Sequence, residues 1–433
     1  DSDAEDTTNG VKTVYVDSTI EKDGTPANTY KTLTAALTAV AEKGTIILKS
    51  NLAAEGETLK HVDSYNLYDN NNNKGDYEGV GECLPLKKSV TLKSDGNSNF
   101  TIGFSIQLAN EKGEFTFQNL TFTPAKGMFA IGAGQTSASK ITVSGCYFYI
   151  TPNDTGSTKQ VAAIHAYQSY ASVNVTGSYF YINGDGGNNY NTAIMLWTGS
   201  ATITDNEVKG YSKFLNIDGL STMTVTGNTA KNMVGPITID GKQKNGTFIQ
   251  LATTSGAENN VTYQVTGNEI LDSDADFKGI ATYPSSTATK LTDIDTDMDV
   301  VFKGSVEIQK ADIRGNIELV AQNGADANVT IADNGSLTVA AGKTLTADAS
   351  ATITNKGSLF NNGTITLAEN AYTSNSGTFY AGAGSTATVP GLKAADAVGT
   401  GKVNGETASG TDPGTTSYSD LVSKLNAKTP VIK

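Results

Sequence analysis

Apolar and polar residues alternate along this chain in short runs that end at Gly, Asn or Asp. Runs such as 141–144 and 224–226 show the period of two that is typical of a strand with one buried face. Few segments place apolar residues at the helical spacing of three and four. The pattern therefore predicts an all-β chain of many short strands.

One helix is expected near the N-terminus, over residues 28–42, with Asn28 or Thr29 as its cap. The residues that share its apolar face are Tyr30, Leu33, Leu37 and Val40. A β-branched strand follows at 45–48. A short helix that leads into such a strand would cover the open end of a stack of coils, which stacked coils need to stay soluble.

Two strand phrases recur in a fixed order between residues 115 and 273. Copies of the first are 163–167, 193–197, 214–218 and 236–240, and copies of the second are 141–145, 173–177, 202–206, 224–228 and 264–268. The positions equivalent to Gly145 are 177, 205, 227 and 267, so the steps are 32, 28, 22 and 40 residues. Two strands per step, with insertions in the turns, predict the successive coils of a parallel solenoid.

Alternation within the first phrase assigns one set of side chains to the core. The expected inward columns are Ile164, Ile194, Leu215 and Ile237, and Ala166, Leu196, Ile217 and Ile239. The intervening residues should then form two outward columns.

The second phrase carries a family resemblance. Three of its copies end in Asn206, Asn228 and Asn268 at one turn position, where earlier coils have Cys146 and Ser178. In this respect residues 30–275 resemble the pectate-lyase-like right-handed parallel β-helix superfamily. The resemblance implies that these asparagines stack as a hydrogen-bonded ladder and that a substrate groove lies over the first-phrase strands.

The rhythm changes from about residue 300, where strand phrases recur every eight to ten residues with Gly or Asn at the turns. This part resembles the β-solenoid stalks of bacterial adhesins. The expected organisation is an acidic leader and first strand (1–27), a parallel β-helix (28–285), a second and finer β-solenoid (300–390), and a linker with a short terminal helix (391–433).

The charge balance limits the partners. The chain has 31 basic and 44 acidic residues, a net charge of −13, and a single arginine, Arg314. Such a surface repels phosphate backbones and anionic membranes, so neither nucleic acid nor a bilayer is an expected partner. Two cysteines, Cys83 and Cys146, form no disulfide framework, although one bridge between them stays open.

The first six residues are acidic. They resemble the stretch that follows the lipidated cysteine in surface lipoproteins of some Gram-negative anaerobes, and the alternative is a plain polar leader. The expected location is extracellular or at the bacterial cell surface, with any membrane contact made through a lipid anchor outside this chain.

The outward columns supply the candidate site. One column is His165, Met195, Asn216 and Thr238, and the other is Tyr167, Trp197, Asp218 and Asp240. Aromatic rings offer flat apolar faces to sugar C–H groups, and carboxylates accept hydrogen bonds from hydroxyls. The predicted ligand-binding residues are therefore His165, Tyr167, Trp197, Asn216, Asp218 and Asp240. A competing interpretation is structural, because Asp218 and Asp240 each precede Gly and could stabilise their own turns.

Catalysis is the weaker alternative. If the chain were a polysaccharide lyase or a glycoside hydrolase, Asp218 and Asp240 would be the catalytic pair. The superfamily's paired aspartates, Gly-His-Gly phrase and Arg-Ile-Lys phrase are absent from this sequence. A third interpretation is a structural spacer. The leading hypothesis is a secreted or cell-surface protein that presents a β-helix face to carbohydrate or another extracellular ligand.

No pattern requires a cofactor, and calcium is the one candidate ion. Residues Asp293, Asp295, Asp297 and Asp299 alternate and would share one face of a strand. Their spacing does not fit an EF-hand, and a solvated acidic strand edge that discourages pairing explains them better.

Overall fold

The computed structural model describes residues 10–62, 81–133, 139–153, 161–182, 191–219, 222–239, 241–244, 246–252 and 262–412. The predicted acidic leader lies outside these residues, as does the terminal helix. The chain divides into two compact units, Asp1–Gly279 and Ile280–Lys433, which we call the N-terminal and C-terminal units. No helix among the described residues is long and apolar enough to cross a membrane.

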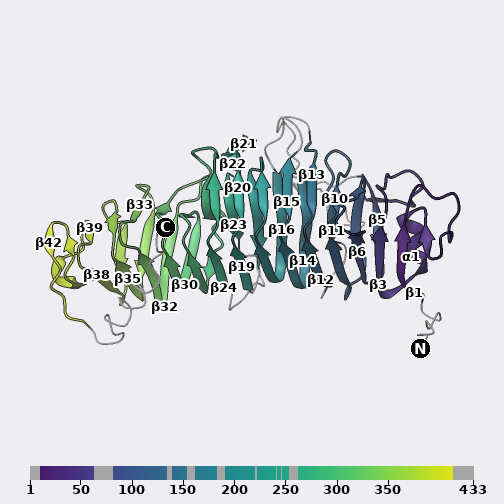
Figure 1. The fold of residues 1–433 in the computed structure, drawn as a ribbon. Coiled ribbons are helices and arrows are strands. Elements are labelled where there is room, and N and C mark those ends of the chain that lie inside the picture. Colours follow the sequence, from purple (N-terminus) through teal and green to yellow (C-terminus); the bar gives the residue numbers. More distant parts are fainter. Residues whose placement is uncertain are drawn as a thin grey trace, which may run out of the picture. The chain divides into compact units, whose positions relative to one another are not determined.

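The N-terminal unit is a parallel β-helix, as the sequence predicted (Figure 1), and it has a third sheet beside the two that the strand phrases indicated. The first sheet contains β5 (Gly81–Leu86), β8 (Ser105–Leu108), β11 (Ile131–Ala133), the first parts of β14 (Val161–Thr176) and β16 (Asn191–Thr204), β18 (Lys213–Asp218) and β23 (Thr247–Ala252). The second contains β1 (Val11–Val16), β3 (Val40–Leu48), β6 (Val90–Ser94), β9 (Glu114–Gln118), β12 (Ser139–Ser144), the second parts of β14 and β16, β19 (Thr222–Thr226) and β24 (Thr262–Thr266). The third contains β7 (Thr101–Ile102), β10 (Thr121–Phe122), β13 (Tyr147–Ile150), β15 (Tyr179–Ile182), β17 (Glu207–Lys209), β20 (Thr229–Lys231) and β25 (Glu269–Leu271).

Coils stack in register, so equivalent side chains lie above one another in the core. One inward column of the first sheet consists of Leu84, Ile106, Ile131, Ile164, Ile194, Leu215 and Ile249. All of these residues are buried. In the third sheet, the Phe148 ring stacks on Phe122 at 5.1 Å and on Phe180 at 4.7 Å between centroids. Burial of these columns is the main force that holds one coil on the next.

One predicted coil was assigned to the wrong segment. The register partner of Leu215 is Ile249, not Ile237, and that of Ile217 is Leu251, not Ile239. Residues Ile237–Ile239 form β21, which pairs antiparallel with β22 (Lys242–Lys244). The Asp-Gly pair at 240–241 is a hairpin signal within an insertion. Ile237 and Ile239 alternate with polar residues as the first phrase does, so the segment resembled another coil.

The turn between the second and third sheets explains the repeated Gly-Asn phrase. Gly145, Gly177, Gly227 and Gly267 have φ between 54° and 68°, and Asp205 takes the same left-handed conformation at 55°. Glycine suits this position because a Cβ is disfavoured there. The turn directs the next side chain into the molecule.

That next side chain belongs to a polar ladder, as the resemblance implied. Asn206 donates from its backbone N and its Nδ2 to Oδ1 of Asn228, both at 2.9 Å, and Asn228 does the same to Asn268 at 3.0 and 2.9 Å. The ladder continues upstream, because Ser178 N donates to Asn206 Oδ1 and Cys146 N donates to Ser178 Oγ. Each amide also donates to a backbone carbonyl, such as Ile203 O for Asn228.

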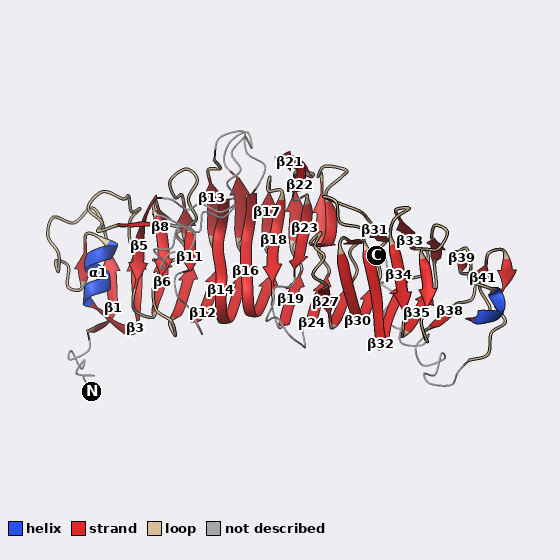
Figure 2. Ribbon diagram, turned by 180° about the vertical axis from the view of Figure 1, so that it is seen from behind, coloured by secondary structure: helices blue, strands red, loops and turns tan. Residues whose placement is uncertain are grey.

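Helix α1 (Leu33–Ala39) lies at the end of the N-terminal unit beside β1 and β3 (Figure 2). It is shorter than the predicted 28–42, and its cap is Thr32, whose side chain accepts from Ala35 N at 3.1 Å. Neither Asn28 nor Thr29 caps it, because Thr29 belongs to β2 (Thr29–Tyr30), which pairs with β1. The strand predicted at 45–48 is confirmed as the end of β3.

Two short strands complete the N-terminal unit. Strand β4 (Lys60–Val62) pairs antiparallel with the start of β5. The polar segment 61–82, which the sequence suggests is a loop, falls mostly on residues 63–80, outside the described part. Strand β26 (Lys278–Thr282) runs across the boundary between the two units.

The C-terminal unit is also a parallel solenoid. Its strands are β27 (Thr289–Leu291), β28 (Asp293–Thr296), β29 (Val300–Phe302), β30 (Ser305–Ile313), β31 (Ile317–Leu319), β32 (Asn328–Val339), β33 (Thr344–Ala347), β34 (Thr352–Asn355), β35 (Ser358–Asn361), β36 (Thr364–Thr366), β37 (Tyr372–Ser374), β38 (Thr378–Ala381), β39 (Thr386–Thr388), β40 (Ala397–Gly399), β41 (Lys402–Val403) and β42 (Glu406–Thr407). Leu345 pairs with Ile365, and Ile365 with Ala387, so these coils span 20 and 22 residues. The predicted spacing of eight to ten residues is therefore the distance in sequence between successive strands of one coil, not the length of a coil. Within the predicted linker, residues 394–407 contain a 3-10 turn (Ala394–Asp396) and strands β40, β41 and β42.

Asn228 provides the first test of the fold. We expect Asn228→Ala to lower the free energy of unfolding by about 2–4 kcal/mol, because it leaves buried donors and acceptors on two neighbouring coils without partners. Urea unfolding followed by far-ultraviolet circular dichroism measures this change. Asn174→Ala, at a partly exposed position of β14, is the matched control and should change stability by less than about 0.5 kcal/mol. Equal effects of the two substitutions would contradict the role of the ladder.

The two cysteines provide a second test of the fold. Cys83 and Cys146 are both buried and free, and burial raises the pKa of each thiol to about 12. Because the thiolate is the reactive form, a thiol reagent at pH 8 should label neither cysteine in the folded protein and both after unfolding. The prediction would be wrong if protein purified without reductant had no reactive thiol after unfolding.

Candidate functional site

The described residues of the predicted site lie on the first sheet. His165, Met195, Asn216 and Gln250 are register neighbours there, and Asp218 lies beside Ala252. Gln250 and Ala252 therefore take the places predicted for Thr238 and Asp240. Thr238 lies in β21 instead, and Asp240 lies outside the described residues.

The described side chains of this column are largely inaccessible. Met195 is 0% exposed, Asn216 5% and Asp218 6%, while Trp197 and His165 are partly buried. Gln250 Nε2 donates to Asn216 Oδ1 at 3.0 Å, which ties two neighbouring coils together. The side chain of Tyr167 lies outside the described part of the molecule. Little surface remains for a ligand, and ligand binding by these residues stays a prediction.

Among the described residues, the register of the first sheet places no second carboxylate beside Asp218. Asp218 has Ala252, not Asp240, as its register neighbour on β23. No group of three or more His, Cys, Asp or Glu in the described residues could hold a metal ion.

The aspartates proposed to form an acidic edge have a different role. Strand β28 pairs with β30 in the C-terminal unit, and three of the four carboxylates bond to groups on the neighbouring coil. Arg314 donates to Asp295 Oδ1 at 2.5 Å, and Lys310 Nζ lies 3.4 Å from Asp293 Oδ2. Asp299 Oδ1 accepts from Asn316 N at 2.7 Å. These carboxylates hold adjacent coils together.

The outer face of the third sheet presents a cluster of four tyrosines, which we call the tyrosine surface. It consists of Tyr147 and Tyr149 from β13 and Tyr179 and Tyr181 from β15. Tyr147 is 37% exposed, and the other three are partly exposed. Ring centroids are 6.0 to 6.3 Å apart, with Tyr179 in contact with each of the other three.

Alternation within two identical segments creates this surface. Tyr-Phe-Tyr-Ile occurs at 147–150 and again at 179–182, and the two copies pair residue for residue. Phe and Ile point into the core, so both tyrosines of each copy must point outward. The repeated Tyr-Phe-Tyr-Ile segment is visible in the sequence, but the predicted site came from the strand phrases on either side of it.

Charged residues continue the face on the next coils. Lys209 Nζ lies 5.6 Å from the centroid of the Tyr181 ring, and Lys231 Nζ lies 4.0 Å from Glu207 Oε1. Burial raises the pKa of Tyr179 above its usual range, and the Glu207 carboxylate adds to the effect. The Tyr179 hydroxyl therefore stays protonated near neutral pH and can donate as well as accept hydrogen bonds.

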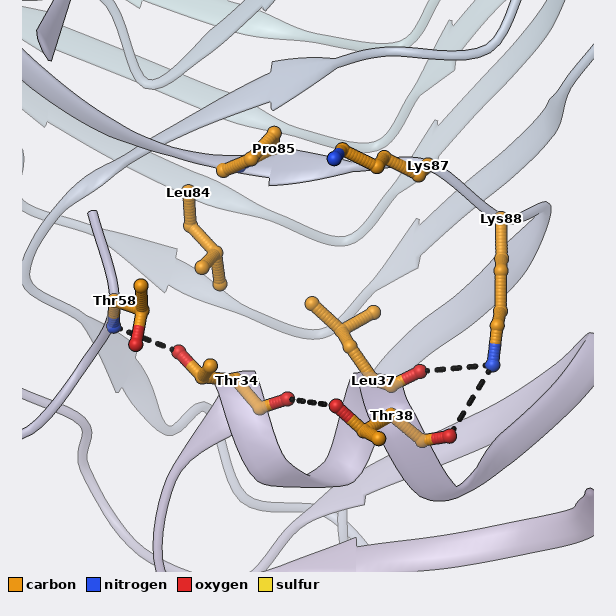
Figure 3. A pocket seen from close by; sticks show the side chains of 8 residues that line it. All are labelled: Thr34, Leu37, Thr38, Thr58, Leu84, Pro85, Lys87 and Lys88. Carbon is orange, nitrogen blue, oxygen red and sulfur yellow. Dashed lines mark hydrogen bonds between the residues drawn. The ribbon is translucent and has the colours of Figure 1, made fainter. Parts of the chain in front are cut away.

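A separate pocket of about 380 Å³ lies between α1 and β5 (Figure 3). Its lining residues are Thr34, Leu37 and Thr38 from α1, Leu84 and Pro85 from β5, and Thr58, Lys87 and Lys88 from outside these two elements. Nothing in the sequence analysis pointed to this pocket, because it depends on how the capping helix lies against the first coils.

Comparison with known proteins identified no relative of this chain. No protein-family model matches the chain, and neither a curated protein nor a solved structure matches it.

The burial of His165 predicts how the stability of the protein depends on pH. Its Nε2 is buried, and burial lowers the pKa of the ring from 6.5 to about 4. The unfolded chain therefore binds this proton more tightly than the folded one. The contribution of the neutral ring should be intact above pH 6.5 and should be lost as the pH falls toward 4, by about 3 kcal/mol at most.

The measurement compares urea unfolding of the wild type and His165→Gln at pH 7 and pH 4.5. We expect the wild type to lose more stability than the variant over this interval. The same loss in both proteins would show that His165 titrates normally in the folded state.

Proposed function

We propose that this protein is a secreted or cell-surface binding protein whose β-helix presents the tyrosine surface to a polysaccharide. The observation that carries the proposal is the set of four solvent-accessible rings on two adjacent coils. Aromatic faces bind sugar C–H groups, and the phenolic hydroxyls add directional hydrogen bonds to sugar hydroxyls.

The regular spacing of the coils supports a polymeric ligand. Parallel strands repeat at about 4.8 Å, so each coil offers another pair of outward positions along the same direction. Beyond the rings lie Glu207 and Lys209 on β17, then Thr229 and Lys231 on β20. A chain of sugars could therefore meet stacking and hydrogen-bonding groups in series.

The asparagine ladder supports a relation to the pectate-lyase-like superfamily, whose members act on extracellular polysaccharides. An extracellular or bacterial cell-surface location follows from this relation, and any membrane attachment would use a lipid anchor beyond this chain. The net charge of −13 argues against nucleic acid as the partner. We propose no catalytic step, since Asp218 lacks a second carboxylate as its register neighbour.

The test is binding of wild-type protein to a panel of plant, bacterial and mucosal glycans, followed by variants on each hit. We expect Tyr147→Ala and Tyr179→Ala each to weaken binding about fivefold or more, which corresponds to about 1 kcal/mol or more. Tyr283→Ala, at a tyrosine that is 42% exposed in the C-terminal unit, is the matched control and should bind like the wild type.

Several outcomes would contradict the proposal. Binding that survives both tyrosine substitutions but falls with Trp197→Ala would move the site to the first sheet. Shortened glycan products after prolonged incubation would mean that the protein is an enzyme. The absence of any hit would exclude the glycans of the panel and favour a protein ligand.

A further inference from the structure

We propose that the pocket between α1 and β5 binds a small ligand with an apolar body and one anionic head, such as a medium-chain carboxylate. Its volume of about 380 Å³ falls within the range of small-molecule sites. This ligand class differs from that of the tyrosine surface, and the inference does not depend on the proposed function.

The pocket exists because a helix, not another coil, covers this end of the stack. Leu84 is the first member of the inward column of the first sheet. Strand β4 pairs with β5 over Gly81–Cys83, so within the described part of the chain the following residues of β5 have a strand neighbour on the β8 side alone. Helix α1 lies on the other side, and Figure 3 shows Leu37 and Leu84 facing one another across the space between them.

The first wall of the pocket is fixed by Glu57 at the start of α1. Glu57 Oε1 accepts from Leu33 N at 2.7 Å, and Oε2 accepts from Thr34 N at 2.8 Å and from Thr34 Oγ1 at 2.5 Å. The carboxylate thus satisfies free N–H groups at the positive end of the helix. Its two oxygens are occupied, which limits the repulsion that it could exert on an incoming anion.

Lys88 fixes the other end of α1. Its Nζ donates to Val40 O at 2.8 Å, Leu37 O at 3.1 Å and Thr38 O at 3.3 Å. These are carbonyls of the last turn of the helix and of the residue that follows it, and a cation there is stabilising. Lys88 therefore stabilises the C-terminal end of α1.

Lys87 is the charged group left for a ligand. It is exposed, and its side chain runs along the rim toward Pro85 in Figure 3. Among the described residues, its Nζ makes no hydrogen bond or ion pair. A carboxylate held there would gain a charge-assisted hydrogen bond, while the body of the ligand covers Leu37 and Leu84.

The other polar groups of the pocket disfavour a sugar. Thr34 Oγ1 donates to Glu57 and accepts from Thr58 N at 2.9 Å, and Thr38 Oγ1 donates to Thr34 O at 3.2 Å. Two of the three threonine hydroxyls are thus already committed, so a ligand with many hydroxyls would lose more hydrogen bonds to water than it regains. An added β-strand is also disfavoured, because Pro85 on the open edge of β5 has no N–H to donate.

The experiment is isothermal titration calorimetry of the full chain with decanoate and with decanamide, its neutral counterpart. We expect saturable binding of one decanoate per chain and at least tenfold weaker binding of decanamide. Lys87→Gln should weaken decanoate at least fivefold and leave decanamide unchanged. Lys112→Gln, at another exposed lysine of the N-terminal unit, is the matched control and should leave both affinities unchanged.

A second variant tests the location independently of charge. Thr38 is exposed on α1 and lines the pocket, so Thr38→Phe should fill the space and abolish binding of both compounds. Its unfolding midpoint should match that of the wild type, which separates blockage from misfolding. Decanoate binding that is absent in the wild type, no tighter than that of decanamide, or indifferent to Lys87→Gln or Thr38→Phe would overturn the proposal. Glycan binding by the tyrosine surface should be unchanged in both variants.

Discussion

In-register stacking of parallel coils is the constraint on which each unit of this molecule depends. A coil can bury its inward side chains only against the equivalent side chains of its neighbours, so every column must remain aligned through insertions of different length. The polar ladder enforces this alignment at a buried turn. Each asparagine bonds to the next coil and also to a backbone carbonyl, so a slip of one residue would leave several buried groups without partners.

The same alignment brings repeated sequence segments side by side and so forms the tyrosine surface. Two copies of Tyr-Phe-Tyr-Ile lie side by side because their coils are in register, and the stack of Phe148 on Phe180 below holds both strands in place. The backbone positions of the four tyrosines on these two strands are thereby fixed. In the pocket beside α1, by contrast, the stack ends and side chains from a helix only partly fill the space over the core.

The repeated strand phrases predicted the solenoid because they are local signals, and the superfamily resemblance implied the ladder. Glycine with a positive φ precedes a ladder asparagine at 227 and at 267. Prediction failed where a long-range choice decided the outcome. Ile237 and Ile249 both lie in alternating strands, and only packing against Leu215 selects Ile249. The start of α1 shifted because β1 takes Thr29 as a strand partner.

The most direct test of the account is a crystal structure of the protein with an oligosaccharide that it binds. The account predicts sugar rings on the outer face of the third sheet, in contact with Tyr147, Tyr149, Tyr179 and Tyr181. Sugar rings over Trp197 on the first sheet, with the tyrosine surface empty, would contradict it.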